Sequence, residues 1–513
     1  MDESNWPSPQ QQWGPLFKAV QLAGLFADSK LFADARPRSR DMASLLAEFA
    51  VQRTRPGFSL KAFVCNAFEL PEYAAVETAP SCAPSDIEEH IRALWVRLLR
   101  RSDQEDPARS SLLPLPHPYV VPGGRFREVY YWDSAFTMQA LLLHDLRPIA
   151  QDMLDNFVAL VRQFGHIPNG NRSYMLSRSQ PPLLFRMVEL LSEADPGRYL
   201  DVLMAEHRFW TAGEAGLAPG QASRRMVRLA DGTLLNRYWD DECTPRDEAY
   251  SEDVATAADM PEREAAQVWR DLRAGAESGW DFSSRWCADP DRLCTIETTA
   301  LLPVDLNSLL WGLERAIARG ARHVGNDAAC DEFVARAAAR AAGIRRYLWS
   351  ERQHCFVDYH WREEQQRELT AATVVPLYAG LANATEAAVI AGVIGSQLLG
   401  KNGLRTSLRC SSQQWDQPNG WGPLQIMAAE GLLRYGHPAL AVDLANRWMG
   451  GIERHFRASG KLVEKYDTER DQIGGGGEYP TQDGFGWTNA SYVIFKRLIE
   501  THSSPTDKPR NTP

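Results

Sequence analysis

The chain has 513 residues and a formal net charge of −10, with 44% hydrophobic and 24% charged residues. These fractions are typical of a soluble globular protein, and the acidic balance excludes a basic surface for nucleic acid or anionic membranes. No run of about eighteen apolar residues occurs, so no membrane span is predicted. The expected partner is therefore a small ligand. A chain of this length predicts two or three domains or one large closed architecture.

The eight cysteines are scattered, without CxxC pairs or the Cys and His spacing of a zinc site. This pattern predicts neither a disulfide framework nor a bound metal. The first residues, MDESNWPSPQQQW, lack the positive charge and the apolar run of a secretory signal. They predict a cytoplasmic protein, with a periplasmic location as the alternative if a signal has been removed.

The two ends of the chain, residues 1–16 and 500–513, are predicted to be flexible tails because they are polar and contain prolines. Between them, apolar residues recur at the three- and four-residue spacing of amphipathic helices, and period-two strand patterns are rare. Predicted helices cover residues 87–99, 183–191, 197–210, 328–348, 370–381, 386–399, 424–435, 438–456 and 489–499, with further apolar stripes at 154–161 and 306–317.

Irregular stretches rich in Gly, Pro and Asn separate these helices. About a dozen helices without an internal repeat favour an α/α toroid, in which helix pairs form two concentric rings and the loops at one end build a pocket. A helical-repeat scaffold is the alternative, but no period of about thirty to fifty residues is visible. We therefore predict an all-α fold with one domain spanning residues 17–499.

Four loop stretches between the predicted helices carry candidate chemistry. The first, PGGRFREVYYWDSAF at residues 122–136, places Asp133 near the start of a helix, where the helix dipole alone could explain a carboxylate. The second, GHIPNGNRSYMLSRSQPP at residues 165–182, includes Arg178, Asn169 and Gln180, an arginine and two amides that can bracket vicinal hydroxyls. A solvated loop is the alternative there.

The third stretch, NRYWDDECTPRDEAYSED at residues 236–253, reads mainly as an acidic surface run. The fourth, ESGWDFSSRW at residues 277–286, sets Asp281 between Trp280 and Phe282. A carboxyl group among aromatic rings is poorly solvated, so its pKa rises and it can hold a proton near neutrality. A general acid requires this property, although spacing alone also allows a helix-capping aspartate.

The C-terminal part adds two further motifs. In QQWDQPNGWGP, at residues 413–423, Trp415 and Trp421 are expected in a pocket wall and Asp416 in a structural role. The stretch EKYDTERDQIGGGGEYPTQDGFGWTN, at residues 464–489, combines two carboxylates, four successive glycines and several aromatic rings. A glycine run alone favours a flexible linker, but this mixture of polar groups and flat apolar faces suits a sugar.

Taken together, these motifs resemble the signatures of the trehalases, glycoside hydrolase family 37, which split α,α-trehalose into two glucoses with inversion. The resemblance covers most of the chain, and it implies an (α/α)6 barrel with the active site in the loops at one end. It also implies that the ligand is bound by residues matching the family's motifs: Arg125, Trp132, Asp133, Asn169, Arg178, Ser179, Gln180, Arg246, Asp247, Glu248, Gly279, Trp415, Trp421 and Glu478. Asp247 is a departure, since the family has proline there.

The resemblance assigns Asp281 as the general acid and Glu464 as the general base. Two carboxylates suffice for this hydrolysis, so no metal or organic cofactor is expected. The substrate is expected to be trehalose, and the protein a monomer. The alternatives are another inverting α-glucosidase on the same barrel, similar to glucoamylase, and a catalytically silent sugar-binding protein.

Overall fold

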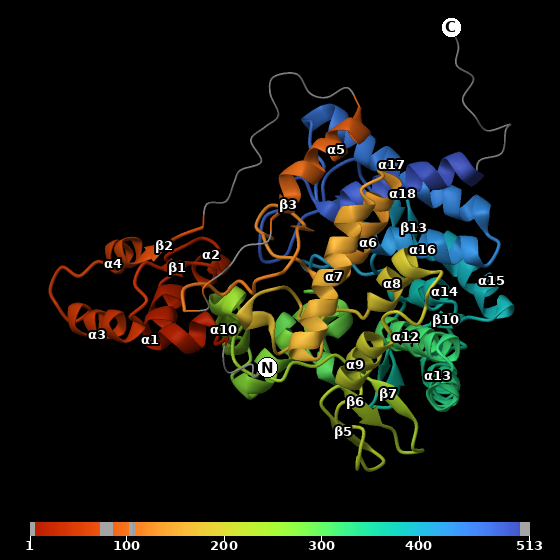
Figure 1. The fold of residues 1–513 in the computed structure, drawn as a ribbon, viewed down its shortest axis with the longest axis horizontal. Coiled ribbons are helices and arrows are strands. Elements are labelled where there is room, and N and C mark those ends of the chain that lie inside the picture. Colours follow the sequence, from red (N-terminus) through yellow and green to blue (C-terminus); the bar gives the residue numbers. More distant parts are fainter. Residues whose placement is uncertain (1–5, 72–85, 102–105, 107, 503–513) are drawn as a thin grey trace, which may run out of the picture.

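A computed structural model describes residues 6–71, 86–101, 106 and 108–502 (Figure 1). Helices dominate the described chain, as the apolar spacing predicts. Four of them form an N-terminal lobe that projects to one side of the molecule (Figure 1): α1 (Pro9–Leu22), α2 (Ser29–Ala33), α3 (Met42–Gln52) and α4 (Leu60–Ala67).

The main body is a closed double ring of helices. Six helices, each in contact with the next, form the inner ring, and α18 closes it by packing on α6: α6 (Tyr131–Leu143), α8 (Leu184–Ser192), α12 (Val304–His323), α14 (Val375–Ala379), α16 (Gly422–Arg434) and α18 (Gly486–His502). The helices that alternate with them along the chain lie outside: α5 (Ile87–Leu98), α7 (Arg147–Phe164), α9 (Leu200–Trp210), α13 (Asp327–Leu348), α15 (Ala384–Val393) and α17 (Pro438–Ser459).

Burial distinguishes the two rings. The inner helix α12 is buried almost all the way round, whereas the outer helix α13 buries one face through Phe333, Ala337, Ile344 and Leu348. A helix that is apolar on every side belongs in a core, and one with a single apolar stripe belongs at a surface. Two helices, α10 (Tyr250–Ala258) and α11 (Ala265–Ser278), are inserted between α9 and α12.

Shorter helical segments occupy several connections. They are the 3-10 helices η2 (Ser173–Met175), η3 (Asp247–Ala249), η4 (Ser284–Trp286), η5 (Leu293–Thr295), η6 (Thr298–Ala300) and η7 (Ala371–Val374), and the π-helical turn η8 (Ile394–Leu398).

The strands of the described chain are short, and all their pairings are antiparallel. Two-stranded pairs are β1 (Arg36–Pro37) with β2 (Phe68–Glu69), β3 (Leu99–Arg100) with β4 (Tyr119–Val120), β9 (Trp349–Ser350) with β10 (Cys355–Phe356), β13 (Leu399–Gly400) with β14 (Gly403–Leu404), and β15 (Asn419–Trp421) with β16 (Lys465–Asp467). Three-stranded sheets join β5 (Gln221–Ser223), β6 (Met226–Arg228) and β7 (Leu234–Asn236), and β8 (Leu301–Leu302), β11 (Tyr359–His360) and β12 (Gln365–Gln366).

The N-terminal lobe differs from the prediction, which expected a flexible tail at residues 1–16 and the barrel domain from residue 17. Helix α1 starts at Pro9 and buries Trp13 and Leu16, so residues 9–16 are ordered helix rather than flexible tail. The lobe also has its own apolar core, in which the ring of Trp13 lies 5.1 Å from Phe32 and 4.9 Å from Phe68. At the other end, α18 continues to His502, and the rest of the predicted C-terminal tail lies outside the described residues.

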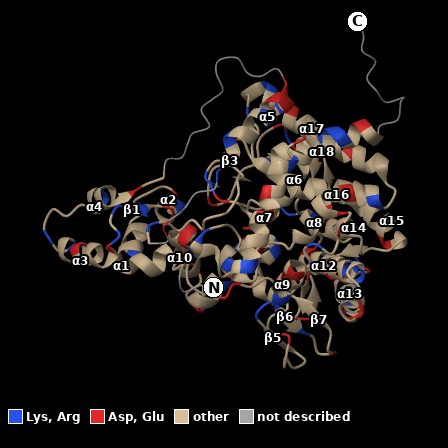
Figure 2. Cartoon of the chain, in the orientation of Figure 1, with Lys and Arg blue, Asp and Glu red and all other residues tan. Residues whose placement is uncertain are grey.

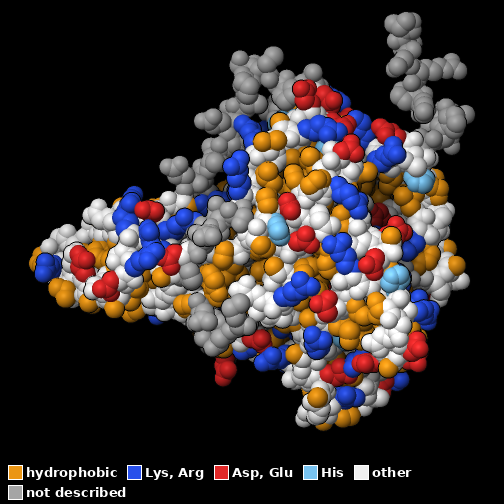
Figure 3. All heavy atoms as spheres, in the orientation of Figure 1, with side chains coloured by type: hydrophobic (Ala, Val, Ile, Leu, Met, Phe, Trp, Pro, Cys, Tyr) orange, Lys and Arg blue, Asp and Glu red, His pale blue; other side chains and the backbone are white. Residues whose placement is uncertain are grey.

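Basic and acidic side chains are both spread over the helices (Figure 2). On the face seen in Figure 3, basic and acidic groups lie side by side. Within the described residues, every helix is too short or too polar to cross a membrane.

Candidate active site

The loops that lead into the inner helices meet at one end of the barrel and enclose a cavity. Its wall contains twelve of the residues predicted to form the site: Arg125, Trp132, Asp133, Asn169, Gln180, Arg246, Glu248, Gly279, Asp281, Trp415, Trp421 and Glu478. Helix N-termini carry partial positive charge, which favours a site rich in carboxylates at this end. The cavity volume is about 70 Å³, against roughly 300–1,000 Å³ for ordinary ligand pockets.

Asp281 reaches the cavity because α11 (Ala265–Ser278) ends three residues earlier. Gly279 has a φ of 74°, the left-handed conformation that lets a helix turn away, and a Cβ there would lie 2.8 Å from the ring of Trp132. Glycine is therefore required at this position for both its backbone and its lack of a side chain. Burial raises the pKa of Asp281 to about 6, although Arg246 opposes the shift. This carboxyl group can hold a proton that an exposed aspartate would lose.

An aromatic wall stands beside Asp281. Trp415 and Trp421 are stacked with ring centres 4.1 Å apart and planes 4° from parallel, and Trp280 stacks on the other side of Trp415 at 5.4 Å. Trp132 and Trp487 close the group with tilted and edge-on contacts. Such flat apolar faces offer a platform for the C–H face of a sugar ring. Both predicted tryptophans face the cavity.

Glu464 lies directly before β16, whose pairing with β15 sets Lys465 opposite Trp421. Its carboxylate is completely buried and accepts hydrogen bonds from Lys465 Nζ at 3.0 Å and from the backbone N–H of Gln482 at 3.0 Å. Burial raises the pKa of Glu464, while Lys465 and the Gln482 N–H oppose the shift by stabilising the anion. Glu464 is not part of the cavity wall, so it stands one layer behind it.

The pKa values of two neighbouring groups, Asp133 and Tyr479, respond to the charges of both Glu464 and Asp281. Burial raises the pKa of Asp133 to about 8, and repulsion from both Asp281 and Glu464 contributes. The pKa of Tyr479 is raised by burial and, again, by Glu464 and Asp281. Asp133 and Tyr479 therefore each lie within electrostatic range of both carboxyl groups.

Ion pairs fix the polar part of the wall. Arg178 is fully buried and donates to Glu248 Oε1 at 2.6 Å, and its other amino group lies 3.5 Å from Asp240 Oδ2. Arg246 donates to Asp253 at 2.6 Å and to Glu478 at 2.9 Å. Burial alone would raise the pKa of Glu248, but the nearby arginines outweigh burial and hold this pKa below its ordinary value. Burial raises the pKa of Glu478 to about 7.

The N-terminal lobe also reaches the cavity. Arg125 lies over the ring of Tyr479 at 4.5 Å and donates two hydrogen bonds, of 2.9 and 2.7 Å, to Asp28 in front of α2. Lys30 of α2 lies in the wall and donates to Asp34 at 2.5 Å and to Glu128 at 2.9 Å. The lobe therefore supplies part of the wall and holds one of its arginines.

Comparison with known proteins identifies the family. The family model described as Trehalase matches residues 24–500. This chain belongs to the trehalase family. It is 50% identical over 497 residues to the periplasmic trehalase of Pseudomonas aeruginosa, covering 96% of this chain and 90% of that one. It is 48% identical over 505 residues to the periplasmic trehalase of Xanthomonas campestris, covering 97% and 87%.

Among solved structures, the neutral trehalase of Saccharomyces cerevisiae is similar, with a TM-score of 0.63 and 27% identity over 81% of this chain and 80% of that one. The closed ring of six inner and six outer helices agrees with this likeness. The prediction of an all-α (α/α)6 barrel is confirmed.

Four residues expected to form the trehalase site lie outside the cavity wall: Arg178, Ser179, Asp247 and Glu464. Arg178 and Glu464 stand behind the wall and contact groups that line it or flank it. The Ser179 hydroxyl donates to the carbonyl of Ile167 at 2.6 Å, a structural bond between two loop segments. Asp247 faces the N-terminal lobe, where it accepts a bond from Gln10 N at 2.8 Å.

The wall also holds residues that the site prediction omits: Phe126, Tyr130, Tyr479, Phe485, Trp487 and Lys30. All but Lys30 belong to the trehalase motif stretches, so their position in the sequence was a usable signal. Lys30 lies in the lobe, in the stretch FKAVQLAGLFADSKLFADARP at residues 17–37, which resembles the start of the trehalase domain but was not assigned to the site.

Arg125 and Arg178 are expected to respond differently to replacement by alanine. Arg125→Ala removes charge-assisted donors from a partly open position and should lower kcat/KM roughly 10- to 100-fold with little change in melting temperature. Arg178→Ala removes the cation that pairs with the buried carboxylate of Glu248, whereas Asp240 keeps Arg273 at 3.0 Å. The loss of the Glu248 partner should also lower the unfolding free energy by about 3–5 kcal/mol. Urea denaturation alongside trehalose kinetics separates the two. Wild-type stability in Arg178→Ala contradicts the ion-pair argument.

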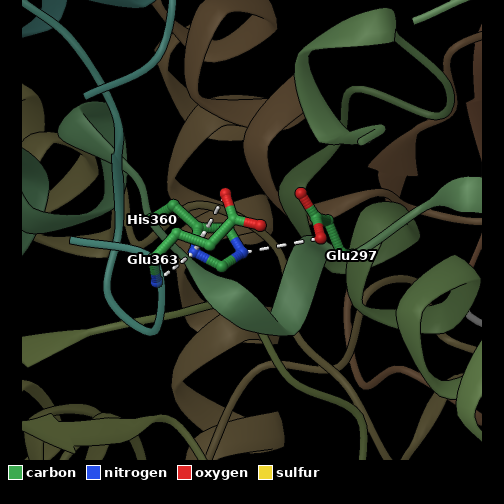
Figure 4. Close-up of side chains that lie close together, drawn as sticks. All are labelled: Glu297, His360 and Glu363. Atoms are coloured by element: carbon green, nitrogen blue, oxygen red, sulfur yellow. Dashed lines mark hydrogen bonds and ion pairs between the residues drawn. The ribbon is translucent and has the colours of Figure 1, made fainter. Parts of the chain in front are cut away.

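A cluster outside the wall resembles a metal site by residue type. One ligand atom each from Glu297, His360 and Glu363 lies within 4.8 Å of the others (Figure 4). However, His360 Nδ1 accepts the backbone N–H of Glu363 at 2.9 Å, and His360 Nε2 lies 3.5 Å from Glu297. Both ring nitrogens are thus engaged within the protein, and Arg367 also pairs with Glu297. The cluster therefore reads as an ion-paired structural group.

Proposed function

We propose that this protein hydrolyses α,α-trehalose to two molecules of glucose with inversion. The observation that carries the proposal is the pair of buried carboxyl groups in different electrostatic settings. Burial raises the pKa of Asp281 to about 6, so it can keep a proton. Glu464 is tied to the Lys465 ammonium, which favours its anion. Burial raises the pKa of both groups, but of the two only Glu464 accepts a hydrogen bond from an ammonium group of the described residues. This asymmetry suits an acid and a base.

In the proposed reaction, Asp281 donates its proton to the oxygen that joins the two sugars. Glu464 takes a proton from a water molecule, whose oxygen attacks the anomeric carbon from the opposite face. The C–O bond to the departing glucose breaks as the new C–O bond forms. Because Glu464 is buried behind the wall, this step requires that its carboxylate contacts a water molecule when substrate is bound. The site residues of the wall and the arginines behind it hold the sugar hydroxyls during this step.

Two observations favour trehalose over other α-glucosides. The family match spans residues 24–500, and relatives of about 50% identity are named trehalases. A glucoamylase-like activity would release glucose from maltose, and a silent binding protein would release none from either sugar. Glucose release from the two substrates, compared side by side, separates these alternatives.

We also propose that the enzyme works in the periplasm. The cytoplasmic prediction is not supported, since bacterial relatives of 47–50% identity are named periplasmic trehalases. Fractionation of cells that produce the native protein, with a cytoplasmic and a periplasmic marker enzyme as controls, tests the location.

Inversion predicts a particular mixture of first products. The attacked half of trehalose should emerge as β-glucose, and the departing half should leave as α-glucose, because its own anomeric bond is not broken. Proton NMR in the first minutes, before mutarotation, should therefore show the two anomers in equal amounts. A first product of α-glucose alone indicates double displacement, and the roles of both carboxyl groups would then be withdrawn.

A further inference from the structure

The N-terminus of α1 is docked on the loop that supplies two charged residues to the cavity. Gln10 N, in the first turn of α1, donates to Asp247 Oδ2 at 2.8 Å, and the Ser8 side chain also bonds to this carboxylate. Gln21, further along the same helix, donates from Nε2 to the backbone carbonyl of Asp247 at 3.3 Å. Both the side chain and the main chain of Asp247 are thus held by α1.

Asp247 is 4% exposed, so its carboxyl group is buried. Burial raises its pKa to about 7, because an ionised carboxylate without water is unfavourable. The free N–H groups at a helix start offer hydrogen bonds and partial positive charge, which offset part of this penalty. The carboxylate and the helix N-terminus therefore satisfy each other, and neither has another role in the proposed chemistry.

The two chain neighbours of Asp247 lie in the cavity wall, whereas Asp247 itself contacts α1. Arg246 lies in the cavity wall, donates to Glu478 and stands 4.8 Å from the ring of Phe282, which follows Asp281. Glu248 lies in the wall and accepts from Arg178. Asp247 is the first residue of the 3-10 turn Asp247–Ala249, with Arg246 as its N-cap and Glu248 as the next residue, so a shift of Asp247 moves both neighbours.

We propose that Asp247 is a positioning residue, held by the N-terminus of α1 so that Arg246 and Glu248 stand at fixed places in the cavity. The inference rests on the proposed function of that cavity. It explains why an acidic side chain is buried beside the site without lining it. It also gives the N-terminal lobe a part in catalysis, since the same lobe holds Arg125 through Asp28.

Two pairs of variants test the contact from its two sides. Asp247→Ala removes the acceptor, whereas Asp247→Asn keeps an oxygen that can accept the Gln10 N–H. Gln10→Pro removes the N–H at a position in the first helical turn where proline is tolerated, and Gln10→Ala keeps it. A misplacement of about 1 Å in a catalytic site can lower the rate by roughly 10²-fold. Asp247→Ala and Gln10→Pro should therefore lower kcat/KM for trehalose roughly 10- to 100-fold, and the other two should stay near wild type.

The double variant Asp247→Ala with Gln10→Pro should lose no more than either single variant, since both remove one contact. Additive losses, wild-type kcat/KM in Asp247→Ala, or an Asp247→Asn variant as poor as Asp247→Ala overturn the inference. If Asp247→Ala fails to fold, Gln10→Pro against Gln10→Ala decides alone.

Binding of glucose, followed by tryptophan fluorescence, gives a readout independent of hydrolysis. Asp247→Ala and Gln10→Pro should weaken it while the melting temperature stays unchanged. A wild-type protein that leaves trehalose intact overturns the proposed function. Unchanged glucose affinity in both variants overturns the positioning role of Asp247.

Discussion

Replacing Asp281 with asparagine should nearly abolish glucose release from trehalose while the protein stays folded. The departing glucose is a poor leaving group unless its oxygen is protonated, and an amide cannot supply that proton at neutral pH. General acid catalysis contributes roughly 10²- to 10⁴-fold, so a loss of at least this size in kcat is expected. Asparagine keeps the shape of the side chain, and hence the aromatic wall beside it should remain intact.

The pH dependence of the wild-type enzyme provides a second view of the same group. A general acid works only when protonated, so activity is present below its pKa and is lost as the pH rises through it. With the pKa of Asp281 raised by burial to about 6, kcat/KM should decline on the basic side near that value. A basic limb near pH 4, as for an exposed aspartate, contradicts the burial argument.

Asp416 serves as the matched control for Asp281. It accepts hydrogen bonds from the hydroxyls of Ser283, Ser407 and Ser411 and from the backbone N–H of Ser284, so it joins two loops below the wall. Asp416→Asn should lower the melting temperature and keep measurable turnover in the folded fraction. Near-normal turnover in folded Asp281→Asn would remove the assignment of the acid.

Helix positions were the part of the fold that the sequence predicted best. The stripe predicted at 328–348 is α13 (Asp327–Leu348), and the one at 438–456 is α17 (Pro438–Ser459). Outer helices bury one face only, so their apolar residues recur at helical spacing and mark the boundaries. The apolar spacing of a single helix does not predict that six helix pairs close into a ring. The (α/α)6 barrel was predicted from the family resemblance.

The error at the N-terminus has a physical cause. Polar residues such as Gln10 to Gln12 suggested a tail, but Ser8 and Gln11 form a capping box that starts α1, and Trp13, Leu16 and Phe17 follow at helical spacing. The helix is kinked at Gly14, which is followed by Pro15. These two residues interrupt the helical spacing of the apolar residues, so the sequence did not indicate a helix there. Short-range capping chemistry was a better guide than composition.

Some features of the candidate site could be predicted from local sequence, and others depend on tertiary contacts. Asp281 and the stacked pair Trp415 and Trp421 could be predicted, because their motifs are local and long. The outward direction of Asp247 could not, since it depends on a contact with Gln10, 237 positions away in the sequence. The ion pair between Arg125 and Asp28 likewise joins two separate segments. Motifs therefore indicated the candidate residues, while tertiary contacts decide which of them face the cavity.

Glu464→Gln should reduce hydrolysis of trehalose roughly 10²- to 10⁴-fold, as expected for removal of a general base. Glutamine retains an oxygen that can accept the backbone N–H of Gln482, so the loop should keep its place. It cannot take a proton from water. Lys465 still donates to Gln414 Oε1 at 2.6 Å and is therefore not left without a partner. Steady-state kinetics with a melting curve measures both parts of this expectation.

A small anion distinguishes a missing base from a damaged site. Azide is a nucleophile that needs no deprotonation, and in α-glucosyl fluoride the fluoride ion leaves without a proton from Asp281. In Glu464→Gln, azide should therefore attack the anomeric carbon, form a C–N bond and release fluoride, giving β-glucosyl azide. The wild type should show little acceleration, because its base already activates water. Glu478→Gln is the control, since Glu478 lies in the wall and pairs with Arg246. If Glu478→Gln is inactive and rescued by azide while Glu464→Gln turns over normally, then Glu478 is the base and Glu464 holds the site together.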